Sequence, residues 1–135
     1  MAEIPNWIYK IVPTEPPTPL PVNLALSSLD AQDGFIHLST ATQTPQTADR
    51  FFDQQRTLWL LRLDKQVVEG EGGRFVWEDG FVHLYGKGTE GTGRWGGARL
   101  GEGTITDVKR CQRSGNQTWS DAMEACVEEG WLVDA

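Results

Sequence analysis

Segments 33–39 (DGFIHLS) and 79–85 (DGFVHLY) nearly repeat each other, and each holds one of the two histidines of the chain. An Asp-Gly pair favours a turn, and the aromatic and branched residues after it favour a strand. Side chains alternate between the two faces of a strand. The residues expected on the two matching faces are Phe35, His37 and Ser39 in one strand, and Phe81, His83 and Tyr85 in the other. If the strands lie in one sheet or face each other, one cavity holds both imidazoles.

Such a cavity is suited to proton transfer. Histidine titrates nearest neutrality, so two of them can divide the general acid and general base roles. Ser39 can orient a substrate or donate to a developing oxyanion, and Tyr85 can donate a proton or stack. The alternative is that both histidines are core residues satisfied by backbone carbonyls, with Ser39 and Tyr85 only packing. A separation of the histidines beyond about 10 Å would favour that alternative, because cooperating groups must reach one substrate.

The remaining pattern predicts an α+β fold with a largely antiparallel sheet. Predicted strands cover residues 7–12, 35–39, 58–63, 75–78, 81–85 and 104–109. Segment 58–63 is apolar on both faces, which is typical of a strand in the middle of a sheet. Val67 and Val68 end this apolar run. Thr44 caps a predicted helix over 44–55, and a closing helix runs from a Ser120 cap to Gly130 with Ala122, Met123, Cys126 and Val127 on one face. The proline-rich stretch 13–21 is expected to be a stiff surface excursion.

Length and charge narrow the class of protein. The 135 residues fit one domain, and the net charge of -7 disfavours binding to nucleic acid or to anionic lipid. No apolar run is long enough for a transmembrane helix, and residues 1–6 do not have the form of a signal peptide, so we expect a cytoplasmic protein. Cys111 and Cys126 are then expected to be buried thiols and not a disulfide.

Several segments resemble the small family catalogued as domain of unknown function 952. The matching residues are Tyr9–Ile11, Ser28–Asp30, Asp33–Ala41, Gln43, Thr47–Ala48, Leu60–Leu61, Trp77–Glu78 and His83–Gly86. This core spans about residues 7–87. A glycine-rich loop follows over 86–103, and a strand-and-helix extension over 104–135. The resemblance fades beyond about Gly86, so the extension is an addition to the family core.

At the superfamily level this family is similar to the ADP-ribosyltransferase fold, in which two small sheets form a cleft with helices outside. That similarity implies that His37-Leu38-Ser39 holds the nicotinamide half of NAD and that Glu78 stabilises an oxocarbenium-like ribose. Tyr9, Phe35, Thr40 and Trp77, which lie in the family-like segments, are further candidate substrate contacts. NAD is therefore a candidate cofactor by analogy alone. The proline-rich stretch replaces the usual opening helix of the family, and Val82 replaces a usual proline, so substrate preference is the least transferable property.

The glycine-rich loop fits the GxGxxG spacing twice. We reject a Rossmann site, because no helix begins in so many glycines. The loop is expected to be a lid, in which Arg94 or Arg99 meets an anionic substrate and Trp95 closes on it, or else an ordinary surface loop. Asp30, Asp33 and His37 are expected to bind no metal, because turn carboxylates commonly bond to backbone N–H groups.

The sequence therefore predicts an enzyme that binds a small molecule in a histidine-lined cleft and uses acid–base chemistry. The alternative is a ligand-binding or protein-interaction module of the same fold without catalysis. Neither the reaction nor the oligomeric state follows from the sequence.

Overall fold

The structure is a computed structural model that describes residues 3–86 and 98–135. In chain order the elements are β1 (Trp7–Val12), α1 (Ser28–Asp33), β2 (Ile36–Leu38), α2 (Gln43–Phe51), β3 (Thr57–Asp64), α3 (Lys65–Gly70), β4 (Arg74–Glu78), β5 (Phe81–Tyr85), β6 (Ile105–Gln112), α4 (Trp119–Ala122) and α5 (Glu124–Glu128). The expected α+β class is confirmed. None of the helices in these two ranges is long and apolar enough to cross a membrane.

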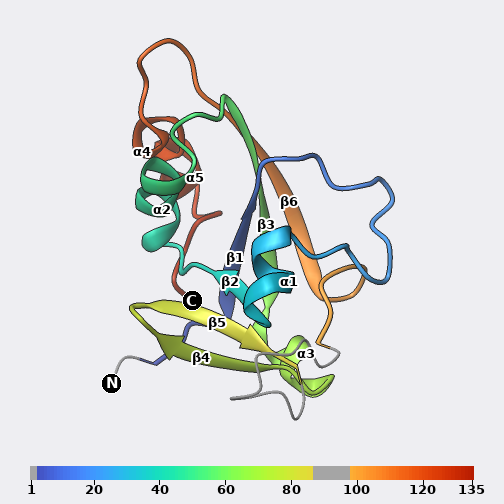
Figure 1. Cartoon of the computed structure of the whole chain (residues 1–135). Coiled ribbons are helices and arrows are strands. Elements are labelled where there is room, and N and C mark those ends of the chain that lie inside the picture. The colour runs from blue at the N-terminus through green and yellow to red at the C-terminus, as the bar shows by residue number, and fades with distance from the viewer. Residues whose placement is uncertain (1–2, 87–97) are drawn as a thin grey trace.

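The strands form two antiparallel three-stranded sheets, ordered β1-β3-β6 and β2-β5-β4. The sheets join where the chain leaves β2, because the backbones of Tyr9 and Ser39 exchange two hydrogen bonds of 2.9 Å. Figure 1 shows α2, α4 and α5 gathered on one side of β1 and β3, while α1 lies in front of β2. This junction brings β1, β2 and both early helices to one place.

Strand β3 is the central strand of its sheet, as its apolar pattern predicts. Leu58 and Leu60 enter a buried cluster with α2 and the C-terminal helices, whereas Leu61 and Leu63 enter a second cluster with β2 and β5. Because side chains alternate between the two faces of β3, this one strand contributes to both buried clusters.

The two Asp-Gly pairs adopt different structures although their sequences match. Gly34 ends α1 in the left-handed conformation with φ of 81°, and its N–H donates to the carbonyl of Asp30. Asp79 and Gly80 both have positive φ, 53° and 83°, which is the two-residue turn that joins β4 to β5. The sequence pattern predicts a turn at both places and misses α1 entirely.

Several expected helix boundaries are wrong. Helix α2 begins at Gln43 and ends at Phe51, and the Thr40 hydroxyl accepts from the Gln43 N–H while the Gln43 side chain accepts from the Thr40 N–H. This reciprocal pair is a capping box, so Thr44 lies inside the helix and does not cap it. Val67 and Val68 lie in α3, not in a strand.

The C-terminal helix is two short helices that meet at Met123, and Thr118 caps the first of them in place of Ser120. Asp49 of α2 accepts from the backbone N–H groups of Trp119 and Ser120, which sets where α4 begins. Because of the break, Val127 turns outward and is 50% exposed. The expected single apolar face is therefore interrupted.

Candidate functional site

His37 and His83 lie directly opposite each other in the β2–β5 pair, and their ring centroids are 5.4 Å apart. Their side chains share one face of the sheet, because their neighbours Ile36, Leu38 and Val82 point into the buried core on the other face. The distance is well within reach of one substrate. The two matched segments therefore meet in the arrangement that proton transfer requires.

Phe35 organises this face. Its ring stacks on His83 with centroids 4.1 Å apart and an interplanar angle of 22°, and it lies tilted against His37 at 4.7 Å and Tyr85 at 5.3 Å. Such contacts restrict ring rotation. Both imidazoles are therefore held against one phenyl ring.

Glu78 fixes the orientation of His83. Its Oε1 lies 2.8 Å from Nδ1 of His83 and accepts a hydrogen bond of 2.5 Å from the Tyr85 hydroxyl. The hydrogen bond from Tyr85, followed by that from His83, holds the pKa of Glu78 below its ordinary value of 4.5. An ionised Glu78 requires a proton on Nδ1, which makes Nε2 the basic atom of the neutral ring. Among the described residues, Nε2 of His83 has no hydrogen-bond partner.

His37 contacts carboxylates with both ring nitrogens. Nδ1 lies 2.6 Å from Oδ1 of Asp30, and Nε2 lies 3.0 Å from Oδ2 of Asp33. Helix α1 positions both aspartates. They lie three residues apart near its end, and this spacing puts their side chains on the same side of the helix. Each ring nitrogen donates a hydrogen bond to its carboxylate when it carries a proton, so the two contacts hold the ring in one orientation.

Asp30 is the buried centre of a polar network. It is 1% exposed, and its Oδ2 lies 2.7 Å from the Lys10 ammonium, which also donates to the carbonyl of His37. Burial alone would raise the pKa of Asp30, but the His37 hydrogen bond and the Lys10 charge outweigh it and hold that pKa below 3.8. Asp30 is therefore a fixed anion that connects α1, β1 and β2.

A cavity of about 600 Å³ adjoins His37. It lies between α1 and α2, beside the edge of β1, and His37, Ser39 and Phe81 line it from the two histidine-bearing strands. A volume of this size suits a small organic ligand. The polar network of Lys10, Asp30 and His37 forms one wall of the cavity, which is otherwise mostly apolar.

The structure brings six of the predicted residues together and places four others elsewhere, namely Tyr9, Thr40, Trp77 and Arg99. Phe35, His37, Ser39, Glu78, His83 and Tyr85 lie on or next to one sheet face, as described above. Trp77 points to the opposite face and packs against the core, because it is one residue away from Glu78 in β4. Thr40 is used in the capping box of α2. Arg94 and Trp95 fall outside the described residues, and Arg99 is bound to Glu71 and to the carbonyl of Val22.

Tyr9, an expected substrate contact, is buried and lies outside the residues that line the cavity. Its side chain is fully buried, and its hydroxyl donates to the carbonyl of Trp131 at 2.7 Å and accepts from the N–H of Val133. The residue thereby holds the C-terminal segment against β1. Side chains alternate along β1, so Lys10, the next residue, lines the cavity instead.

Replacing Tyr9 by Phe is expected to lower the free energy of unfolding by about 1–3 kcal/mol, because the Trp131 carbonyl and the Val133 N–H lose a buried partner. Urea denaturation measures this loss. Unchanged stability would contradict the structural role assigned to the hydroxyl. Because Tyr9 does not line the cavity, ligand binding by the folded variant should be unaltered.

Sequence reasoning missed Lys10 and the role of Asp30. The sequence does contain a signal for Asp30, because Ser27 is a typical N-cap and Gly34 a typical C-terminal residue of a short helix that would contain it. In the structure the Ser27 hydroxyl accepts a hydrogen bond from the Asp30 N–H. No local signal identifies Lys10, which reaches Asp30 only through the junction of β1 with β2.

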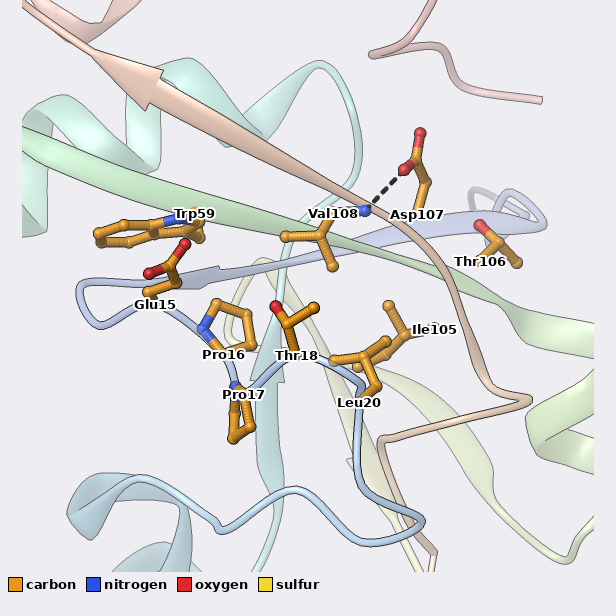
Figure 2. A pocket seen from close by; sticks show the side chains of 10 residues that line it. All are labelled: Glu15, Pro16, Pro17, Thr18, Leu20, Trp59, Ile105, Thr106, Asp107 and Val108. Carbon is orange, nitrogen blue, oxygen red and sulfur yellow. Dashed lines mark hydrogen bonds between the residues drawn. The ribbon is translucent and has the colours of Figure 1, made fainter.

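The proline-rich stretch lies across the other sheet and forms a separate cavity of about 350 Å³ against β3 and β6 (Figure 2). Figure 2 shows Leu20 next to Ile105, Pro16 on the side of Val108 and Glu15 next to Trp59. None of the predicted site residues lies among the described residues that line it. The stretch therefore covers apolar surface, and this cavity contains neither histidine.

Comparison with known proteins places the chain among proteins without an assigned activity. Residues 21–90 match the family model described as "Protein of unknown function (DUF952)". The crystal structure of protein CC0527 from Caulobacter crescentus is 24% identical with a TM-score of 0.57, and the match covers 83% of this chain and 91% of that chain. A double mutant of the same protein gives the same values. No curated protein matches. At this identity the likeness extends to the fold alone.

Proposed function

The chain belongs to the DUF952 family of unknown function. From the geometry of the site, we propose that it is an enzyme that transfers protons on a small molecule at the His37–His83 pair. One observation carries the proposal. Two imidazoles lie 5.4 Å apart, His37 lines a cavity of about 600 Å³ with His83 directly behind it in the sheet pair, and each ring has Nδ1 against a carboxylate. Carboxylate–histidine pairs of this kind orient the ring and set the atom that reacts.

The two rings suit different roles. Nε2 of His83 is the general base, because Glu78 holds the proton on Nδ1. His37, which donates to Asp30 and Asp33, is the acid, and a substrate oxygen takes the place of the partly exposed Asp33 at Nε2. A proton leaves a substrate C–H or O–H for His83, while negative charge develops on an oxygen that faces His37. Ser39 lines the cavity beside this oxygen.

The ADP-ribosyltransferase-like fold and the use of NAD stay predictions. Two small antiparallel sheets with flanking helices support the fold assignment. The role implied for Glu78, stabilisation of a ribose cation, competes with its hydrogen bonds to His83 and Tyr85. We therefore favour proton transfer over ribosyl transfer as the activity.

A non-catalytic binding module is the second candidate, because each histidine already has an ionic partner and His83 is 6% exposed. The two candidates differ in turnover. The probes are exchange of the α-protons of phenylacetone in D2O, and hydrolysis of 4-nitrophenyl acetate and 4-nitroacetanilide, each followed with the full chain. We expect at least one rate above that of free imidazole at equal concentration, and its loss in the His37→Ala, His83→Ala double variant. Rates no higher than imidazole on all three probes would favour the binding module.

A further inference from the structure

We propose that the cavity beside the histidines takes an uncharged ligand with an aromatic or branched aliphatic body and one carbonyl or hydroxyl group. This inference rests on the proposed function, since it names the substrate class of the same site. It comes from the walls of the cavity, from the pairing of its charges and from the hydrogen-bond donors that remain available.

Most of the cavity wall is apolar. Helix α2 contributes Phe51 and Phe52, β5 contributes Phe81, α1 contributes Leu29, and the edge of β1 contributes Ile11 and Val12. The Phe51 and Phe81 rings meet edge to face with centroids 6.5 Å apart. Aromatic walls of this kind bind apolar groups and flat rings. The body of the ligand is therefore apolar and large enough to touch both α2 and β5.

The charges in the cavity are already paired. Apart from His37, the cationic side chain among the described lining residues is Lys10, and its ammonium lies 2.7 Å from the Asp30 carboxylate. The His37 ring lies between the carboxylates of Asp30 and Asp33. A ligand carboxylate or phosphate would thus enter without a free counter-charge, and a ligand ammonium would lie next to Lys10. Burying an unpaired charge is far more costly than burying a neutral polar group. A dinucleotide such as NAD, with two phosphates, fits this wall poorly.

Neutral hydrogen-bonding groups find partners there. The Lys10 ammonium has three donors and, within the described part of the chain, uses two of them, one to Asp30 and one to the carbonyl of His37. Ser27 uses its oxygen as the acceptor for the Asp30 N–H, so its hydroxyl proton is available as a donor. These donors can satisfy a carbonyl or hydroxyl oxygen without adding net charge. The polar end of the ligand therefore lies at the junction of α1 with β1, next to His37.

The test uses three probes with the same phenyl body: 2-phenylacetamide is neutral, phenylacetate is anionic and phenethylamine is cationic at neutral pH. Chemical-shift titration of the full-length ¹⁵N-labelled protein gives each dissociation constant. We expect phenylacetamide to bind at least about tenfold more tightly than either charged probe, because only it leaves no unpaired charge. Phenylacetate or phenethylamine binding as tightly as phenylacetamide would overturn the inference.

Phe51→Ala places the binding in this cavity. Phe51 is 58% exposed, so its removal should leave the fold intact, yet it should weaken phenylacetamide binding about fivefold through lost apolar contact. Val127→Ala is the matched control, because Val127 is 50% exposed on α5 and lies outside the cavity. Equal binding by both variants would also contradict the inference.

His83→Ala separates this inference from the proposed function. His83 does not line the cavity, so the variant should still bind phenylacetamide. If the neutral probe binds as expected but the wild type turns over none of the reactive probes, the proposed function fails and the ligand class stands. If turnover is found while charged probes bind best, the ligand class fails and the proposed function stands.

Discussion

Replacing Asp30 by Ala is expected to lower the free energy of unfolding by about 3–5 kcal/mol at pH 7, the largest stability effect of any single change at the site. The carboxylate is 1% exposed and neutralises Lys10, which is 8% exposed. Its loss leaves a buried ammonium without a partner and removes the acceptor for the backbone N–H and Nδ1 of His37. Urea denaturation of the variant measures the loss.

A double variant distinguishes the lost ion pair from lost packing. Asp30→Asn keeps the shape of the side chain but leaves Lys10 charged, whereas Lys10→Met together with Asp30→Asn removes both charges. The double variant should be more stable than Asp30→Asn alone, because no uncompensated charge stays buried. If it is less stable, the charges do not couple in the way that their 2.7 Å contact implies.

The same carboxylate predicts how stability depends on pH. The pKa of Asp30 is held below its ordinary value of 3.8 in the folded chain, so its contribution is fully present above pH 3.8. It is lost as the pH falls through the lower, folded pKa, because the folded state must then take up the proton. Wild type should therefore lose more stability than Asp30→Asn in this acid range. Asp53→Asn, a change at an exposed carboxylate, is the control and should follow wild type.

Replacing His83 by Ala is expected to lower turnover about 10²- to 10⁴-fold on whichever probe the wild type converts, since the variant lacks the general base. The cavity walls supply most of the substrate contacts, so kcat should fall far more than the Michaelis constant. A variant that keeps full turnover would contradict the assignment of His83 as the base.

Glu78 is a positioning residue for this base. Glu78→Gln is expected to lower kcat about 10- to 100-fold with little effect on KM, because the amide no longer imposes a proton on Nδ1 of His83. Tyr85→Phe removes only the second hydrogen bond to Glu78 and should have a smaller effect. Equal losses in the two variants would show that Glu78 acts through packing and not through the orientation of the ring.

The alternation of side chains along two matched segments was enough to predict that Phe35, His37, His83 and Tyr85 share one face, because period-two geometry is local. The local pattern left open whether the two strands share one sheet or face each other, and the pairing of His37 with His83 across 46 positions comes from the structure. Strand β3 was similarly predictable, since an apolar run on both faces belongs in the middle of a sheet.

The contacts that local pattern could not predict are those made between distant elements. Lys10 reaches Asp30 only because β1 meets the end of β2, and Tyr9 is buried because the C-terminal segment returns to cover β1. Trp77 was assigned to the site from its neighbour Glu78, although adjacent strand residues face opposite sides. Helix α1 was missed because its six residues hold few apolar side chains, and its caps are the main signal.

The central claim is that Glu78 holds a proton on Nδ1 of His83 and leaves Nε2 free to act as a base. A long-range ¹H–¹⁵N spectrum of protein labelled at its two histidines measures this directly, at a pH where the ring is neutral, with His37→Ala to assign the signals. The account predicts that His83 carries its proton on Nδ1 in wild type and changes toward the other tautomer in Glu78→Gln. A wild-type His83 protonated on Nε2 would contradict it.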